Sequence, residues 1–284
     1  MGRWGSVEQQ TLSNPFSLEG VGIHTGSPSR VTVNPAEPDA GRIFLVNGTV
    51  IPARAQYVVD TTRCTTLGRD GVRVSTVEHL LSALVGCGVD NCVIEVDGPE
   101  IPILDGSALP FVDAIQSVGI EVQGRPAHFV RLRDEVVVSG NGSELRAAPA
   151  DDLYLEVRTE FDEWPEGAAA IVTEGRDGVP IGYRANIAPA RTFAFRREVE
   201  MLIAAGLAKG GSLGNALIIT PPDSFSSALR VASEWCAHKV IDVIGDLALL
   251  DARLAIRLHA LRPGHRINIS LAQSISTQLG DQTP

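Results

Sequence analysis

The sequence predicts an α+β protein of two domains. Short strand-like runs, separated by glycine and proline, are followed by segments with the apolar spacing of helices, and this order occurs twice along the 284 residues. Strands that come before helices favour a sheet with helices on one face. We therefore expect two such two-layer domains, residues 1–124 and 125–284, packed face to face with a ligand site in the cleft between them.

The first domain opens with a sheet-forming region that turn residues such as Pro35 and Gly41 divide. Strands are expected at residues 11–18, 30–33, 42–46 and 55–59. The glycine-rich stretch 20–26 lacks the G-x-G-x-x-G spacing of a dinucleotide loop, so we interpret it as a bend where backbones approach closely.

A helix is predicted over residues 75–84, and the glycines that follow end it. Ser75 and Glu78 have the spacing of a capping box at its start, which would give Glu78 a structural role. His79 lies in the first turn, where the helix dipole favours the neutral imidazole that a metal ligand needs.

A strand at residues 91–96 and a second helix, capped by Ser107 and running through Ile115, complete the first domain. The pattern relaxes at residues 118–127, which include glycine and proline. We take this segment as the domain boundary.

The second domain repeats the order of strands before helices, and its polar stretch 162–182 indicates a loop or an edge hairpin. Strands are expected at residues 129–138, 144–147, 153–161, 191–195, 216–220 and 253–261, and helices at 198–205, 228–250 and 265–275. Residues 277–284 lack apolar periodicity and should fray.

Composition excludes two classes of partner. The net charge is −10, with 34 acidic and 24 basic residues, and no Lys/Arg cluster could follow a phosphate backbone, so no nucleic-acid partner is expected. No run approaches the roughly 18 apolar residues of a transmembrane segment. Residues 1–10 lack the features of a leader peptide, so we expect a cytoplasmic protein, and we expect a monomer.

The cysteines are scattered without a C-x-x-C pair, at Cys64, Cys87, Cys92 and Cys236. In a chain of this size we expect them to be reduced thiols. Any metal site would therefore use histidine and carboxylate ligands.

Candidate chemistry is concentrated in the stretch 238–246. In a helix, four-residue spacing puts His238, Asp242 and Asp246 on one face, among apolar neighbours. Buried charges need a partner, and a metal ion would be one. A hydrogen bond between His238 and Asp242 on an ordinary helix would explain the spacing without any ligand.

Two other predicted helix starts, at Glu78 and at His265, supply further candidates. His79, His238 and Asp242 would make a zinc site with an open fourth position, the catalytic pattern. Glu78 could then take a proton from a water that zinc acidifies, and His265 could stabilise an oxyanion or protonate a leaving amine. The same ligand set also serves non-haem iron enzymes, so Fe2+ is an alternative to Zn2+. A non-catalytic sugar-nucleotide-binding protein with a structural metal is a third hypothesis.

Seven motifs, in order between residues 11 and 273, together resemble one known family. They are Gly-Val-Gly-Ile-His-Thr-Gly (20–26), Ser-Thr-Val-Glu-His-Leu (75–80), Ile-Pro-Ile-Leu-Asp-Gly-Ser-Ala (101–108), Arg-Thr-Phe-Ala-Phe (191–195), Gly-Gly-Ser (210–212), His-Lys-Val-Ile-Asp-Val-Ile-Gly-Asp (238–246) and Gly-His (264–265). The combination resembles the UDP-3-O-acyl-N-acetylglucosamine deacetylases, the LpxC family of lipid A biosynthesis. The resemblance implies two ribosomal-S5-like domains and a hydrolase that removes the N-acetyl group from an acylated UDP-sugar with one catalytic Zn2+.

The resemblance also assigns catalytic roles. The zinc ligands correspond to His79, His238 and Asp242. Glu78 matches the general base, and His265 matches the general acid or electrostatic catalyst, oriented by Asp246. Thr192 would hydrogen-bond the developing oxyanion.

Substrate contacts are implied for Lys239, Phe161, Phe193, Phe195 and Arg262. The ring of Phe161 would stack on uracil, Arg262 would bind the diphosphate, and the other phenylalanines would face the sugar or acyl chain. Residues 199–219 resemble the insert that forms the acyl-chain tunnel. The chain departs from the family at Ser143, where some members have lysine, and across residues 162–182.

Overall fold

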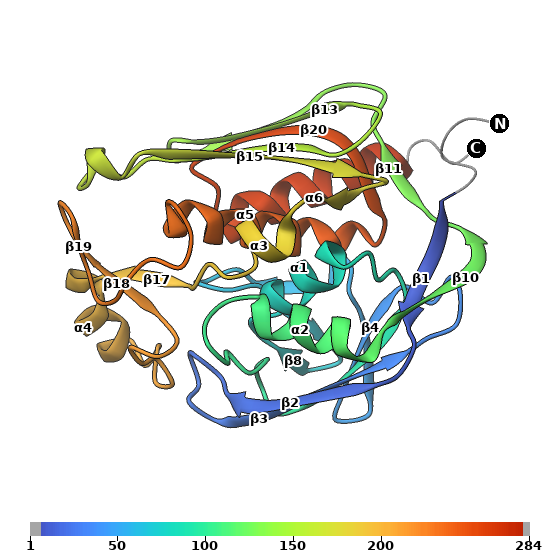
Figure 1. Ribbon diagram of the computed structural model, residues 1–284, viewed down its shortest axis with the longest axis horizontal. Coiled ribbons are helices and arrows are strands. Elements are labelled where there is room, and N and C mark those ends of the chain that lie inside the picture. Colours follow the sequence, from blue (N-terminus) through green and yellow to red (C-terminus); the bar gives the residue numbers. More distant parts are fainter. Residues whose placement is uncertain (1–6, 281–284) are drawn as a thin grey trace.

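The computed structural model describes residues 7–280 and confirms an α+β fold. Two large sheets form outer layers, and the main helices lie between them (Figure 1). We call residues 7–124 the N-terminal region and residues 125–280 the C-terminal region, and their division into two domains stays a prediction. Across residues 7–280, no helix combines the length and apolar character that a membrane span requires.

The N-terminal region contains a sheet with the strand order β2-β3-β9-β4-β5, in which β4 and β9 run parallel and the other pairs antiparallel. Its strands are β2 (Phe16–Val21), β3 (Pro28–Pro35), β4 (Arg42–Val46), β5 (Thr49–Pro52) and β9 (Cys92–Asp97). A smaller sheet contains β6 (Val58–Asp60), β7 (Thr66–Arg69) and β8 (Val72–Val74). Alternation places Val31 and Val33 in the core, beneath α1 (Glu78–Gly86) and α2 (Leu109–Val118).

The C-terminal region contains a sheet with the order β12-β13-β20-β14-β15-β16, and β11 also pairs with β20. These strands are β11 (Phe129–Arg131), β12 (Val136–Gly140), β13 (Ser143–Pro149), β14 (Tyr154–Thr159), β15 (Ala169–Arg176), β16 (Val179–Pro180) and β20 (Arg253–Leu261). Its inner face is covered by α5 (Glu234–Leu247) and α6 (His265–Gly280). The chain between β14 and β20, which run parallel, includes α5.

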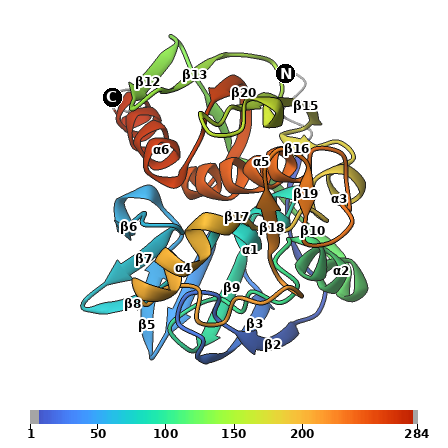
Figure 2. The same cartoon turned by 90° about the vertical axis from the view of Figure 1, so that its left-hand side faces the viewer.

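A small subdomain lies at one side of the molecule, where α4 packs against β17 and β18 (Figure 2). Its elements are β17 (Phe193–Phe195), α4 (Arg196–Ala204), β18 (Leu217–Thr220) and β19 (Ser224–Phe225). The short helix α3 (Tyr183–Asn186) precedes them and packs through Tyr183 against α1. No side chain of α4 is fully buried. This helix therefore covers the underlying elements loosely.

Helices α1 and α5 pack directly against each other and join the two regions. Both are buried on nearly every side, because a sheet lies beyond each of them. The helices approach closely at Gly245, where an added Cβ would lie 2.0 Å from the carbonyl oxygen of Glu78. The missing side chain allows the helices that carry the candidate site to touch.

One prediction about the first region's strands is wrong. Residues 11–18 do not form one strand: β1 (Glu8–Leu12) ends before β2 begins at Phe16. Residues 118–127, expected to be the domain boundary, include β10 (Ile120–Pro126), which pairs antiparallel with β1, and their role as a boundary stays a prediction. This two-stranded ribbon accommodates Pro126 at its end and a register shift, so glycine and proline did not prevent pairing.

The predicted capping box is also wrong. Ser75 instead forms a β-bridge with Glu100, and its backbone N–H donates a hydrogen bond to the Pro99 carbonyl. Helix α1 begins only at Glu78. The Glu78 carboxylate accepts a hydrogen bond from the Thr65 backbone N–H at 3.1 Å. Glu78 is therefore directed away from Ser75. The cap predicted for α2 is close to the observed one, since Ser107 Oγ accepts a hydrogen bond from the Leu109 N–H at 3.2 Å.

Several element boundaries also shift. Residues 55–57 form a 3-10 helix before β6, and the helix expected from 228 begins at Glu234, after Ser233 with φ of 47°. Residues 162–182 do form a hairpin, β15 and β16, after the 3-10 helix Pro165–Gly167. Helix α6 includes residues 277–280, which were expected to fray, because Leu279 packs against the core.

The expectations for residues 1–6 and 281–284 lie outside the described residues. The four cysteines are free, as expected.

Candidate functional site

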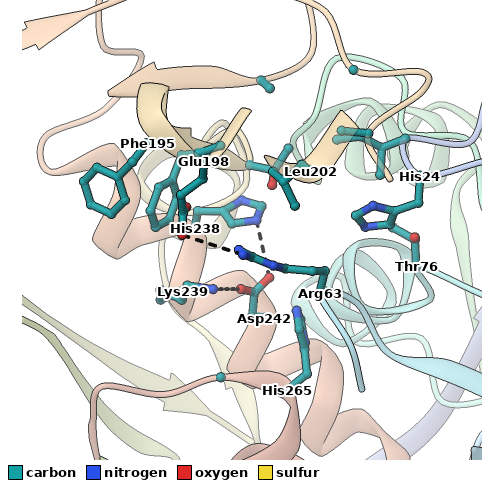
Figure 3. Close-up of a pocket in the computed structure, with 18 of the residues that line it drawn as sticks. His24, Arg63, Thr76, Phe195, Glu198, Leu202, His238, Lys239, Asp242 and His265 are labelled. Carbon is teal, nitrogen blue, oxygen red and sulfur yellow. Dashed lines mark hydrogen bonds and ion pairs between the residues drawn. The ribbon is translucent and has the colours of Figure 1, made fainter. Parts of the chain in front are cut away.

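A cavity of about 770 Å³ opens between the two regions and the subdomain of α4 (Figure 3). All but one of the site residues expected from the sequence line it, namely Glu78, His79, Phe161, Thr192, Phe193, Phe195, His238, Lys239, Asp242, Arg262 and His265. The exception, Asp246, lies behind His265 and contacts it. The structure thus brings together residues that are almost 190 positions apart in the sequence.

Three buried side chains meet at the floor of the cavity. His79 comes from α1, while His238 and Asp242 are one turn apart on α5, and their ligand atoms all lie within 4.8 Å of one another. Asp242 Oδ1 is 3.4 Å from His238 Nε2 and 3.9 Å from His79 Nε2. His238 Nδ1 lies 3.1 Å from the Ala190 carbonyl. Because a carbonyl only accepts, Nδ1 carries the proton and Nε2 presents a lone pair to the cluster.

The charges of these residues fit a divalent cation. Burial lowers the pKa of His79 to about 3, and burial also lowers the pKa of His238, so both rings are neutral. Burial alone would raise the pKa of Asp242, but the Lys239 ammonium beside it holds that pKa well below its usual value. Asp242 Oδ1 is buried without a hydrogen-bond partner. Two neutral imidazoles and an ionised carboxylate with a free oxygen are the donor set that Zn2+ takes at catalytic sites.

Lys239 lies at the edge of this cluster. Its Nζ is 2.7 Å from Asp242 Oδ2 and 5.6 Å from the centre of the Phe193 ring. Lys239 therefore occupies the Asp242 oxygen that does not face the histidines, and its ammonium is only partly buried. A substrate in the cavity could reach it.

Glu78 and His265 form a second pair beside the cluster, with Glu78 Oε1 3.8 Å from His265 Nε2. Burial raises the pKa of Glu78 to about 8. Burial opposes the charged form of His265, but the carboxylate of Asp246, hydrogen-bonded to its ring, outweighs this effect and raises its pKa to about 9. His265 is therefore a cation at neutral pH, within reach of the cavity.

Asp246 holds His265 in place. Asp246 Oδ2 accepts from His265 Nδ1 at 3.0 Å and from Asn268 Nδ2 at 2.8 Å, and its Oδ1 accepts from Thr65 Oγ1 at 2.5 Å. This carboxylate is fully buried. Sequence reasoning missed Thr65 and Asn268, because neither belongs to a motif with recognisable spacing.

Aromatic rings form one wall of the cavity. The Phe161 ring centre is 5.2 Å from Phe195 and 6.1 Å from Phe193, both edge to face, and Phe161 stacks on Trp164 at 5.9 Å. Thr192 directly precedes Phe193 and lines the same cavity, and its backbone N–H donates to the Gly106 carbonyl at 2.8 Å.

The polar end of the cavity contains Arg262 and Ser143. The Arg262 guanidinium pairs with Asp162 and donates to the Glu160 carbonyl at 3.0 Å. Ser143 Oγ donates to the Arg262 carbonyl at 2.7 Å. The position at which the chain departs from the family that it resembles thus lies next to the residue expected to bind phosphate.

The other end is apolar and is formed by the segment 199–219, with Val199, Leu202, Ile203 and Leu213 in the lining. Glu198 at the start of α4 forms an ion pair of 3.6 Å with Arg63 of the N-terminal region (Figure 3). Arg63 and His24 also line the cavity, and sequence reasoning assigned neither of them to the site. An isolated arginine in a loop carries no signal that would have identified it.

Comparisons with known proteins agree with this geometry. The family model described as UDP-3-O-acyl N-acetylglycosamine deacetylase (LpxC) matches residues 9–277. A relative from Anaeromyxobacter dehalogenans (strain 2CP-C) is 41% identical over 279 residues, which cover 95% of this chain and 88% of the relative. One from Myxococcus xanthus (strain DK1622) is 41% identical over 281 residues, 96% of this chain and 88% of the relative. Both are named UDP-3-O-acyl-N-acetylglucosamine deacetylase.

The match to the family model extends over nearly the whole chain and includes every residue of the cavity floor. The family resemblance expected from the seven sequence motifs is therefore confirmed. The chain belongs to the UDP-3-O-acyl N-acetylglycosamine deacetylase family.

Proposed function

We propose that the protein is a zinc-dependent hydrolase that removes the N-acetyl group from UDP-3-O-acyl-N-acetylglucosamine, leaving a free 2-amine and acetate, the committed step of lipid A biosynthesis. The observation that carries this proposal is the buried set His79, His238 and Asp242, with Glu78 and His265 beside it in one cavity. Free thiols and a nucleotide-sugar substrate support a cytoplasmic location.

The ion would be held by His79, His238 and Asp242. When bound, Zn2+ polarises a carbonyl and makes water more acidic. Glu78, whose pKa falls back toward its usual range when positive charge is added nearby, takes a proton from the water that attacks the acetyl carbon. The carbonyl oxygen becomes an oxyanion as the new C–O bond forms.

The oxyanion is stabilised by the Thr192 hydroxyl and by the positive charge of Lys239. His265 starts as a cation beside Asp246 and gives its proton to the amide nitrogen as the C–N bond breaks. The products are acetate and the amine, so one water is consumed. Phe161 and Arg262, which line the cavity, would bind the uracil and the diphosphate, and the apolar end would take the acyl chain.

A paired assay tests the proposal. Purified protein should bind about one zinc per chain and release acetate from the acylated UDP-sugar, and far more slowly from UDP-N-acetylglucosamine, because remote contacts lower the barrier only when the acyl chain is present. Metal-loaded, folded protein that releases no acetate would contradict the hydrolase. Turnover that needs oxygen and iron would instead support the non-haem iron alternative.

The variant Glu78→Gln separates the two roles of this region. It should keep the zinc, and its rate of acetate release should fall about 10²- to 10⁴-fold, because a general base contributes that much to the rate. The control Glu121→Gln, on an exposed position of β10, should keep both. Loss of zinc in Glu78→Gln would show that this carboxylate holds the site together and is not the base.

A further inference from the structure

Arg191 and Glu234 form a buried ion pair just behind the cavity wall. Arg191 Nε is 2.7 Å from Glu234 Oε1, and Arg191 Nη2 is 3.0 Å from Oε2. The guanidinium and the carboxylate therefore form a bidentate (two-pronged) ion pair. The side chains are only 5% and 0% exposed, and neither lines the cavity. The remaining guanidinium donors reach Ser227 Oγ and the Ala228 carbonyl.

The pair connects two residues of the candidate site. Arg191 directly precedes Thr192, and Glu234 lies one helical turn before His238 on α5. The Arg191 backbone N–H also donates to Glu234 Oε1, at 2.9 Å. One turn further along α5, His238 Nδ1 donates to the Ala190 carbonyl. The segment 190–192 is thus fastened to α5 at two points, one of which is the metal ligand itself.

A contribution to folding stability does not by itself account for a buried ion pair at this position. The free-energy cost of removing two charges from water offsets much of their attraction, so apolar side chains of similar volume stabilise a core as well or better. A two-pronged ion pair instead fixes direction and distance. Its position matters because Thr192 follows within one residue and His238 within one turn.

We propose that Arg191 and Glu234 are positioning residues that set the place of the Thr192 hydroxyl relative to the metal ligand His238 and hold the His238 ring in the orientation its ligand role needs. The part of this inference that concerns Thr192 rests on the proposed function. The part that concerns His238 requires only that the cluster binds a metal.

The chain offers a matched control. Arg253 and Asp90 form an ion pair of the same geometry, with contacts of 2.9 and 2.7 Å and side chains 6% and 13% exposed. This pair also joins distant parts of the chain, but it lies away from the cavity. Arg191→Lys and Arg253→Lys make the same chemical change, since one ammonium cannot replace the two-pronged guanidinium.

The experiment uses Co2+ as a spectroscopic probe of the cluster, with purified wild-type protein, Arg191→Lys, Glu234→Gln and Arg253→Lys. We expect Arg191→Lys and Glu234→Gln to shift the visible absorption bands of bound Co2+ and to weaken Co2+ binding about 10- to 100-fold, the usual effect of removing support behind a ligand. With acylated substrate, kcat should fall about 10- to 100-fold while KM changes less than about threefold. Arg253→Lys should lower the melting temperature and leave the Co2+ spectrum and kcat as in the wild type.

A double variant tests whether the two residues act together. Arg191→Lys/Glu234→Gln should lose about as much as the worse single variant, because the two act as one unit. The proposal is overturned if both single variants melt at lower temperature and yet keep the wild-type Co2+ spectrum and kcat. If Arg191→Lys does not fold, the Co2+ spectrum and kcat of Glu234→Gln test the proposal alone. If neither variant folds while Arg253→Lys does, the pair serves folding and not positioning. If wild-type protein binds Co2+ but releases no acetate, the proposed function fails, and the spectra still decide the role of the pair at His238.

Discussion

Side chains of one chemical type take different charge states around the cavity because their surroundings differ. Burial keeps His79 neutral, whereas the half-buried His265 is a cation because the Asp246 carboxylate faces it. Ionised Asp242 keeps one oxygen free for a ligand. A neutral donor and a cationic proton source can therefore lie in one small site, as hydrolysis of an amide requires.

Glu234 should contribute a part of the folding stability that depends on pH. Burial by itself would raise its pKa, but hydrogen bonds from Arg191 and the Arg230 backbone hold it below the usual 4.5. A carboxyl whose pKa is lower in the folded than in the unfolded protein contributes stability that is fully present above the unfolded value and is lost as the pH falls through the folded value. Urea unfolding from neutral pH to about pH 3 should show a steeper loss of unfolding free energy below pH 4.5 for wild type than for Glu234→Gln. Equal slopes for the two proteins would contradict this assignment, and Glu121→Gln should retain the wild-type slope.

At the scale of elements, the site depends on the contact of α1 with α5. Helix α1 carries Glu78 and His79, the proposed base and one proposed ligand, and α5 carries the other two proposed ligands, so their separation determines the distances within the cluster. Gly245 allows this contact, since a Cβ there would overlap the backbone of Glu78. The glycine is a steric requirement of packing and not of backbone conformation, because it lies within a helix.

Gly245→Ala should therefore damage both stability and activity. Overpacking should lower the unfolding free energy by about 1–3 kcal/mol, although alanine is the better helix former by about 1 kcal/mol. Displacement of Glu78 should lower kcat at least about tenfold, because misplacement of about 1 Å at a reacting group can cost up to about 10² in rate. Urea unfolding and steady-state acetate release measure the two effects.

The control is Gly280→Ala, a helical glycine whose added Cβ would meet nothing within 4 Å. It should be neutral or slightly stabilising. A Gly245→Ala protein as stable and active as the control would show that α1 and α5 can separate without harm.

For the whole molecule, the proposed metal would connect the two regions, since His79 belongs to one and the other ligands to the second. The interface is otherwise held by the α1 and α5 contact and by polar links such as Arg253 with Asp90. A ligand that binds only the folded protein shifts the folding equilibrium in its favour.

Removal of metal by a chelator should thus lower the melting temperature, and added zinc should restore it. With free zinc at about 1,000 times its dissociation constant, the stabilisation amounts to about 4 kcal/mol. The variant Asp242→Asn should melt at the same temperature with and without chelator, because it lacks the charged ligand. An equal response in Asp242→Asn would place the stabilising metal elsewhere, and no response in wild type would argue against a resident metal.

Much of the fold was predictable where local patterns are strong. The strands at 42–46 and 253–261 have the predicted bounds, because β-branched and apolar runs there end in turn residues. The capping box failed because Ser75 found a backbone partner near Glu100, 25 residues further along the chain. The strand at residues 120–126 was not predicted, because β1, a distant segment, supplies the hydrogen bonds that a glycine-containing strand could not supply alone.

The sequence by itself determined which residues form the candidate site. The four-residue spacing put His238 and Asp242 on one helix face, and the resemblance of the motifs to a known family added His79, Glu78 and His265. Only the tertiary structure decided that α1 meets α5 at Gly245, that the Asp242 oxygen is left without a partner, and that Arg191 and Glu234 support the segment beside His238. The reason is physical: periodicity reports which face of an element is buried, but which faces meet, and at what distance, depends on packing between segments far apart in the chain.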